Sequence, residues 1–248
     1  MSIQYEPVNT QSAALQIAEQ IQQSITDGTL KANDKLPTEE ELARQFNVSR
    51  PTIREALKRL AAKSLIRSRR GPTGGTFVNR PSQEDMVGTM TTAVGLMIGM
   101  GEFDLSDIAE TRHELELVCA RLASERRNDD ELNRMKAEIT IQKDESLSDE
   151  DFCASDVRYH RALVDATHNP VLKFQMFTVI EALQPVENLV IYRFRQREKI
   201  VRHHEKILSA ITAQDQEKAK DAINEQMAYL RERFAQAQDW RSQKDNET

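Results

Sequence analysis

Residues 36–57 read LPTEEELARQFNVSRPTIREAL, and they carry the clearest local signals for the structure of the first part of the chain. Thr38 stands three residues before Glu41, the spacing at which a hydroxyl and a carboxylate each satisfy an open backbone N–H at a helix start. The helical pattern then continues to about Phe46. A short helix is therefore expected over these residues.

A second helix is expected directly after a tight turn at Asn47 and Val48. Ser49 can cap this helix, and Pro51 costs little in its first turn because the N–H groups there have no intrahelical partners. The helical pattern extends to about Lys63. Two short helices joined in this way predict a helix–turn–helix.

Further elements flank this motif on both sides. Apolar residues at helical spacing predict a first helix over residues 13–26. Two strand-like runs, at residues 65–69 and 76–79, surround a glycine-rich turn and predict a hairpin. Three short helices followed by a glycine-tipped hairpin are the layout of a winged helix–turn–helix.

The second part of the chain, from Gln83 onward, is helical in pattern almost without interruption. The expected fold class is therefore mostly α, with an N-terminal winged helix–turn–helix followed by an all-helical antiparallel bundle. A helix over Met86–Met100 is apolar on all sides, which favours a buried connection between the domains. Six or seven helices are expected, with breaks near residues 99–104, 128–130, 146–149, 169–170 and 214–215.

The composition fits one or two globular domains, since 39% of the 248 residues are hydrophobic and 30% are charged. Two cysteines exclude a disulfide scaffold and fit a reducing compartment. The first residues lack the layout of a secretory signal, and the longest apolar stretch falls short of the roughly 20 residues of a membrane span. The expectation is a soluble, cytoplasmic protein without a membrane partner.

The charge is distributed unevenly along the chain. The net charge is −6, yet residues 43–80 carry ten basic side chains and only one acidic side chain, Glu55. A local excess of this kind attracts a polyanion. The alternative is a solvated basic face without a partner.

The second helix of the helix–turn–helix carries the chemistry for reading DNA. Arg50 and Arg54 are four residues apart and project from one face, and arginine can hold guanine by two hydrogen bonds. Each arginine alone could serve solubility, but a capped, turn-linked motif with a basic helix and a basic hairpin favours nucleic-acid binding. Candidate contacts to bases or phosphates are Arg44, Ser49, Arg50, Thr52, Arg54, Lys58, Arg70 and Gly71.

The runs LPTEEELARQF, VSRPTIREAL and SRRGPTGGTFV resemble the DNA-binding domain of GntR-type bacterial regulators, over about residues 11–79. The resemblance implies operator contacts by Arg50, Thr52, Arg54, Arg70 and Gly71. One departure is Glu40, because the fatty-acid-responsive member FadR has a DNA-contacting arginine inside the same motif.

The second part resembles the FCD ligand-binding domain of the FadR subfamily over about residues 86–236, in the runs ETRHELELVCARLA, DVRYHRALVDATHNP, HHEKILSAI and AINEQMAYL. The resemblance implies an effector that is a small organic or sugar acid. It also implies a DNA-binding domain over residues 11–80, preceded by an arm over 1–10. The effector-binding and dimerisation domain then covers 81–238, and a polar tail covers 239–248.

A divalent metal site is a candidate in this second domain. Asp156 and His160 stand four residues apart, so that both can converge on a cation from one helix turn, and His204 could join them from a later helix. The resemblance places these three residues on metal-ligand positions and places Gln226 where the pattern has a third histidine, which weakens a zinc-like site. The alternatives are a polar pocket that binds the effector directly, or a core network without a ligand.

Arg112 is the candidate anchor for an anionic effector, because a guanidinium can hold a carboxylate by two parallel hydrogen bonds. The alternative is an ion pair with Glu116, four residues further on. The other candidate effector contacts are Tyr159, Tyr192 and Gln226, although aromatic residues at such positions also occur in cores.

The sequence thus predicts a bacterial transcription regulator, a repressor that binds a pseudo-palindromic operator in double-stranded DNA as a homodimer. A small carboxylate effector would shift the population between dimer arrangements that fit the operator well or badly. Two alternatives remain open. One is an architectural DNA-binding protein without an effector, and the other is a metal-dependent enzyme, although no general base or nucleophile accompanies the candidate ligands.

Overall fold

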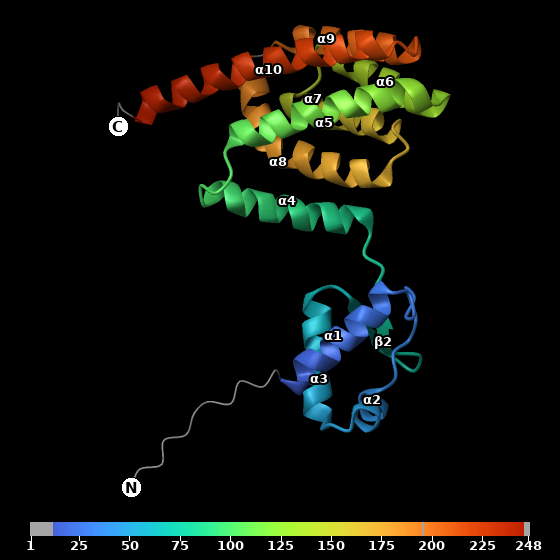
Figure 1. Ribbon diagram of the computed structural model, residues 1–248. Helices are drawn as coiled ribbons and strands as arrows, with labels where there is room; N and C mark the ends of the chain where they lie inside the picture. Colours follow the sequence, from blue (N-terminus) through green and yellow to red (C-terminus); the bar gives the residue numbers. More distant parts are fainter. Residues whose placement is uncertain (1–11, 195, 246–248) are drawn as a thin grey trace. The chain divides into compact units, whose positions relative to one another are not determined.

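The computed structural model describes residues 12–194 and 196–245, with side chains placed except at residues 105, 185–194 and 234–245. The described chain contains ten helices and one two-stranded sheet, which confirms the expected fold class (Figure 1). It forms two compact units that divide between Ser82 and Gln83. The arm expected over residues 1–10 lies outside the described residues.

The first unit is a winged helix–turn–helix with every element that the sequence predicts. The two strands are antiparallel, with Ile66 opposite Val78 and Arg69 opposite Gly75. The elements are α1 (Ala13–Thr26), α2 (Glu39–Phe46), α3 (Arg50–Ala62), β1 (Ile66–Arg69) and β2 (Gly75–Val78).

The core of this unit comes from the apolar faces of its helices. In α1, Ile17 and Ile21 are four residues apart and therefore point to the same side, towards α3. In α3, Ile53 and Leu60 lie on the opposite face from the arginines and are fully buried. This packing fixes α3 and leaves its polar face at the surface.

The start of α2 is held by a capping box. The backbone N–H of Thr38 donates to Glu41 Oε2 at 2.7 Å, and the N–H of Glu41 donates to Thr38 Oγ1 at 3.3 Å. Asn47 ends the helix with φ +51°, a left-handed conformation that asparagine tolerates.

We expect Thr38→Ala to lower the free energy of unfolding by about 1 kcal/mol, because one backbone N–H at the helix start loses its acceptor. Urea denaturation followed by circular dichroism measures this difference. Thr73→Ala, in the loop of the hairpin, is the matched control and should change stability by less than about 0.5 kcal/mol. Equal losses in the two variants would contradict the role of the cap.

The second unit is a bundle of seven helices. Five of the breaks between its helices fall where the sequence predicts them. A sixth break, between α8 and α9, was not predicted, because no glycine or proline marks it. The last helix continues past residue 239, where the polar tail was expected to begin, because no helix-breaking residue occurs before its end. The helices are α4 (Gln83–Gly99), α5 (Leu105–Arg126), α6 (Asp129–Gln142), α7 (Asp149–Asp165), α8 (Pro170–Phe194), α9 (Arg197–Thr212) and α10 (Gln216–Asp245).

Among the described residues, α5, α6, α7, α9 and α10 contribute the buried side chains of the largest core in this unit. Helix α10 packs against α5 and α9, α6 packs against α7 and α9, and α7 also contacts α5 and α8 (Figure 1). Both cysteines, Cys119 and Cys153, are buried free thiols, as expected. Among the described residues, no helix is long and apolar enough to cross a membrane.

Helix α4 differs from the expectation of a helix buried on all sides. It packs against α8, and Val87 is its one buried residue. A single neighbouring helix covers only one face, so apolar side chains on the other faces stay uncovered within the chain. The large exposed apolar residues are Met86, Met90 and Leu96 on α4, and Met100 and Phe103 in the turn that follows it.

Candidate functional site

The polar face of α3 presents the two arginines expected to read bases. The side chains of Arg50 and Arg54 are 55% and 57% exposed. Both lie beside Glu39 of α2: Arg54 Nε donates to Glu39 Oε2 at 2.8 Å, and Arg50 NH2 lies 3.9 Å from the same oxygen. One carboxylate therefore orients both guanidinium groups without burying them.

The remaining candidates on the two helices have mixed roles. Ser49 and Thr52 form the start of α3, where their hydroxyls share a hydrogen bond of 2.8 Å. Arg44 lies 3.8 Å from Glu40, and both side chains are well exposed. Lys58 is exposed on α3. The structure therefore leaves Arg44 and Lys58 accessible to phosphates, and these contacts stay predictions.

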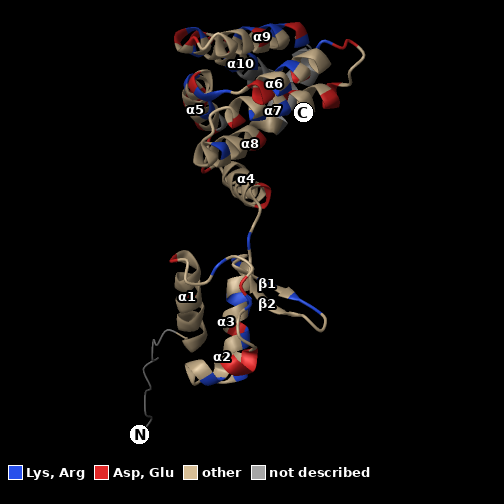
Figure 2. Cartoon of the chain, turned by 90° about the vertical axis from the view of Figure 1, so that its right-hand side faces the viewer, with Lys and Arg blue, Asp and Glu red and all other residues tan. Residues whose placement is uncertain are grey.

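The hairpin presents a second basic element, visible as the blue loop between β1 and β2 in Figure 2. The guanidinium of Arg69 lies over the Phe77 ring at 5.6 Å, whereas the next residue, Arg70, is exposed at the tip. Gly71 has φ +106°, a conformation that favours glycine. A Cβ on Gly74 would lie 2.5 Å from the carbonyl oxygen of Arg69, so the loop closes too tightly for a side chain there.

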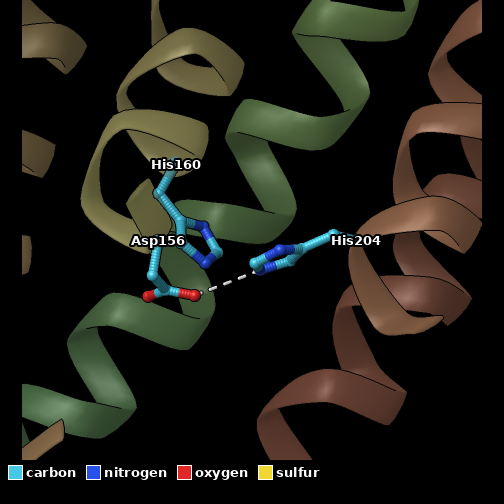
Figure 3. A group of neighbouring side chains, drawn as sticks. All are labelled: Asp156, His160 and His204. Atoms are coloured by element: carbon cyan, nitrogen blue, oxygen red, sulfur yellow. Dashed lines mark ion pairs between the residues drawn. The ribbon is translucent and has the colours of Figure 1, made fainter. Parts of the chain in front are cut away.

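The candidate metal ligands meet inside the second unit. Asp156 and His160 project from α7, and His204 projects from α9 towards them (Figure 3). The ligand atoms of the three residues lie within 4.8 Å of one another, and His204 Nε2 is 3.3 Å from Asp156 Oδ1. Gln226 of α10 joins them, with its Nε2 3.3 Å from His160 Nε2.

The imidazoles of His160 and His204 are both held in orientation by buried side chains that contact their Nδ1 atoms. His160 Nδ1 lies 2.9 Å from Glu116 Oε1, and His204 Nδ1 lies 2.8 Å from Gln142 Oε1. Because these oxygens are acceptors, each Nδ1 carries the proton and each Nε2 turns a lone pair towards Asp156 and Gln226. Burial lowers the pKa of His204 well below its ordinary value, which keeps this ring neutral.

This arrangement fits a divalent cation. His204 Nε2 and Gln226 Oε1 are buried, and neither has a hydrogen-bond partner among the described residues. Burial raises the pKa of Asp156, so a positive charge at its carboxylate would relieve the cost of keeping it ionised there. Neutral imidazole and carboxylate are ligands for first-row divalent metals.

Arg112 forms a buried ion pair with Glu116, the alternative that the spacing allows. Arg112 NH2 lies 3.2 Å from Glu116 Oε1, and the side chains are 2% and 0% exposed. Burial by itself would raise the pKa of Glu116, but the charge of Arg112 and the hydrogen bonds from Arg112 and His160 outweigh it and lower that pKa to about 2. The guanidinium thus already has a carboxylate, and its contact with an effector stays a prediction.

The structure describes the side chain of only one of the two tyrosines that are candidate effector contacts. Tyr159 is fully buried: its ring stacks on His204 at 3.9 Å between centroids, and its hydroxyl donates to the carbonyl oxygen of His204 at 2.8 Å. It therefore supports a candidate ligand from the core. The side chain of Tyr192 lies outside the described residues. Gln142 was missed at sequence level, because a glutamine at the end of a polar helix carries no signal of burial.

An exposed basic recognition helix next to a basic hairpin is the surface of a DNA-binding transcriptional regulator. Residues 13–78 match the bacterial regulatory proteins of the gntR family, and residues 107–229 match the FCD domain. The chain belongs to the GntR family of bacterial transcriptional regulators and carries an FCD domain. The alternative of a metal-dependent enzyme is therefore wrong.

Relatives match along most of the chain. An uncharacterized HTH-type transcriptional regulator of Bacillus subtilis (strain 168), YcbG, is 30% identical over 96% of this chain and 96% of its own. The galactonate operon transcriptional repressor of Escherichia coli (strain K12) is 30% identical over 80% of this chain and 86% of its own. The solved structure of Streptococcus agalactiae GntR shares the fold, with a TM-score of 0.57 and 23% identity over 88% of this chain and 99% of its own.

Proposed function

We propose that the protein is a repressor of the FadR subfamily that binds a pseudo-palindromic operator as a homodimer and responds to a small organic or sugar acid. Residues 11–80 read DNA, and residues 81–238 sense the effector and dimerise. The observation that carries the sensing role is the buried cluster of Asp156, His160 and His204, whose acceptor atoms face one another. The name of the galactonate operon repressor, a relative, supports both repression and a sugar-acid effector.

The exposed apolar side chains of α4 support the homodimer. On α4, Leu96 is 62% exposed and Met86 and Met90 are also exposed; Met100, 63% exposed, and Phe103 follow directly in the turn after the helix. Exposed apolar side chains gathered on one element are typical of a protein interface. A second copy of this chain is the occupant that suits a regulator, because two-fold symmetry doubles the base contacts of one small recognition helix.

A divalent metal held by Asp156, His160 and His204, with Gln226 beside them, completes the proposed sensor. The bound ion would supply positive charge to hold the effector's carboxylate. Glu116 and Gln142 keep the two imidazoles turned inwards, and Tyr159 and Gln226 border the same interior. Asp156, His160, His204 and Gln226 thus bring four buried polar side chains together from three helices.

The test is selection of DNA from a random pool by the full-length protein, followed by titration of effectors. We expect enrichment of an inverted repeat, a dimeric mass in light scattering, and loss of the shifted band when galactonate, lactate or related hydroxy acids are added. An enriched repeat whose affinity no hydroxy acid changes, with no metal in elemental analysis, would instead favour the architectural protein.

A further inference from the structure

Gln226 is the unusual member of the buried cluster. It lies on α10, is 3% exposed, and places its terminal amide 3.3 Å from His160 Nε2. Since His160 carries its proton on Nδ1, its Nε2 accepts from the amide N–H₂. The amide oxygen, Oε1, is buried and has no hydrogen-bond partner in the part of the chain that the structure describes.

The spacing of these atoms suits ligands of one ion. Ligand atoms about 2.1 Å from a common ion lie about 3.0–3.4 Å apart, in octahedral or tetrahedral geometry. The contact from Gln226 to His160 and the contact from His204 to Asp156 are both 3.3 Å. A half-turn of the amide exchanges its nitrogen and oxygen, and puts Oε1 where it can face the same ion as the imidazoles.

The donor set differs from that of a zinc-selective site. Two imidazole nitrogens are joined by a carboxylate oxygen from Asp156 and an amide oxygen from Gln226, both hard donors. Zinc favours nitrogen and sulfur donors in a tetrahedron, whereas manganese accepts carboxylate, carbonyl and water ligands. Each replacement of a nitrogen donor by an oxygen donor therefore lowers the affinity for zinc relative to that for manganese.

We propose that Gln226 sets the metal selectivity of this site, by lowering its preference for Zn²⁺ over Mn²⁺ relative to a site with an imidazole at the same position. The inference rests on the proposed function, because it requires that the cluster binds a metal. It adds the assignment of a specificity-determining residue, and with it a class of ion whose coordination sphere is rich in oxygen.

The experiment compares dissociation constants of the full-length wild type, Gln226→His and Gln226→Glu. The dissociation constant for Zn²⁺ is measured by competition with a chromophoric chelator. That for Mn²⁺ is measured from the loss of the free-ion signal in electron paramagnetic resonance. We expect Gln226→His to tighten Zn²⁺ binding by about tenfold or more and Mn²⁺ binding by less than about threefold. Gln226→Glu keeps an oxygen donor, so its ratio of the two constants should stay within about threefold of wild type.

The outcomes separate the inference from the function on which it rests. If both ions bind but Gln226→His leaves their ratio unchanged, or if Gln226→Glu shifts the ratio as far as histidine does, the assignment of selectivity to Gln226 is wrong while the metal site stands. If neither ion binds to the wild type or to either variant, both are wrong. Circular dichroism of each variant establishes that it is folded before the constants are compared.

Discussion

Arg54→Ala is expected to weaken operator binding by the proposed dimer by about 2–6 kcal/mol, or roughly 30-fold to 10⁴-fold. An arginine that holds guanine by two hydrogen bonds contributes about 1–3 kcal/mol to base discrimination, and a dimer uses it once in each half-site. Glu39 contacts this guanidinium through Nε, so the side chain is oriented before DNA arrives. Gel-shift titration of the selected inverted repeat and of random duplex, at one salt concentration, measures the effect.

The control for this prediction is Lys58→Ala on the same helix. Lys58 is exposed on α3 and suits contact with a phosphate. Its loss should weaken binding to both duplexes by the same factor, and should reduce the salt dependence of the binding constant by about 1 for each protomer. Arg54→Ala should instead weaken binding to the selected repeat much more than binding to random duplex. Parallel losses on the two duplexes in Arg54→Ala would show that this arginine contacts phosphate and reads no base.

Glu116→Ala is expected to lower the free energy of unfolding of the second unit by about 3–5 kcal/mol, because it removes the buried carboxylate that contacts both Arg112 and His160. For a unit of this size the melting temperature falls by about 2–4 °C per kcal/mol, so a decrease of roughly 6–20 °C is expected. Differential scanning calorimetry of the full chain measures it.

Helix α5 supplies a matched control at the same spacing. Arg121 and Glu125 form an ion pair of 3.4 Å whose side chains are 40% and 39% exposed. Glu125→Ala should cost less than about 1 kcal/mol, since an exposed pair is screened by water. The double variant Arg112→Met/Glu116→Leu should recover most of the loss, because it removes both buried charges. Equal losses for Glu116→Ala and Glu125→Ala would contradict the assignment.

The first unit was predictable because its signals are local. Thr38, Glu41 and Ser49 satisfy backbone N–H groups within three residues of themselves, and the left-handed Asn47 closes the turn within the same stretch. Such interactions depend on sequence spacing alone. The helices and strands of this unit therefore end within one or two residues of their expected limits.

The second unit shows where local signals are insufficient. The boundary between α8 and α9 carries no glycine or proline, so no local signal in the sequence marks it. Helix α4 is apolar on all sides, and periodicity cannot say which sides one chain covers. The expectation of complete burial failed because α8 covers only the side that includes Val87.

The candidate site was predictable in part for the same reason. Asp156 and His160 converge from one helix turn, a relation that spacing shows directly. His204 and Gln226 come from other helices, and only the resemblance to the FCD domain linked them to the first pair. The role of Gln142 depends on how α6 packs against α9, which no local pattern encodes.

The two units bury separate sets of side chains: the cluster under α3 contains no residue from the helical bundle. Each set of side chains is therefore packed within its own unit. Under the proposed function, substitutions after Ser82 would change the inducer while the promoters that the first unit recognises stay the same. The separation into two units also suits engineered genetic circuits. There the bundle would be exchanged to change the inducer, while the winged helix–turn–helix is kept so that the same operator is recognised.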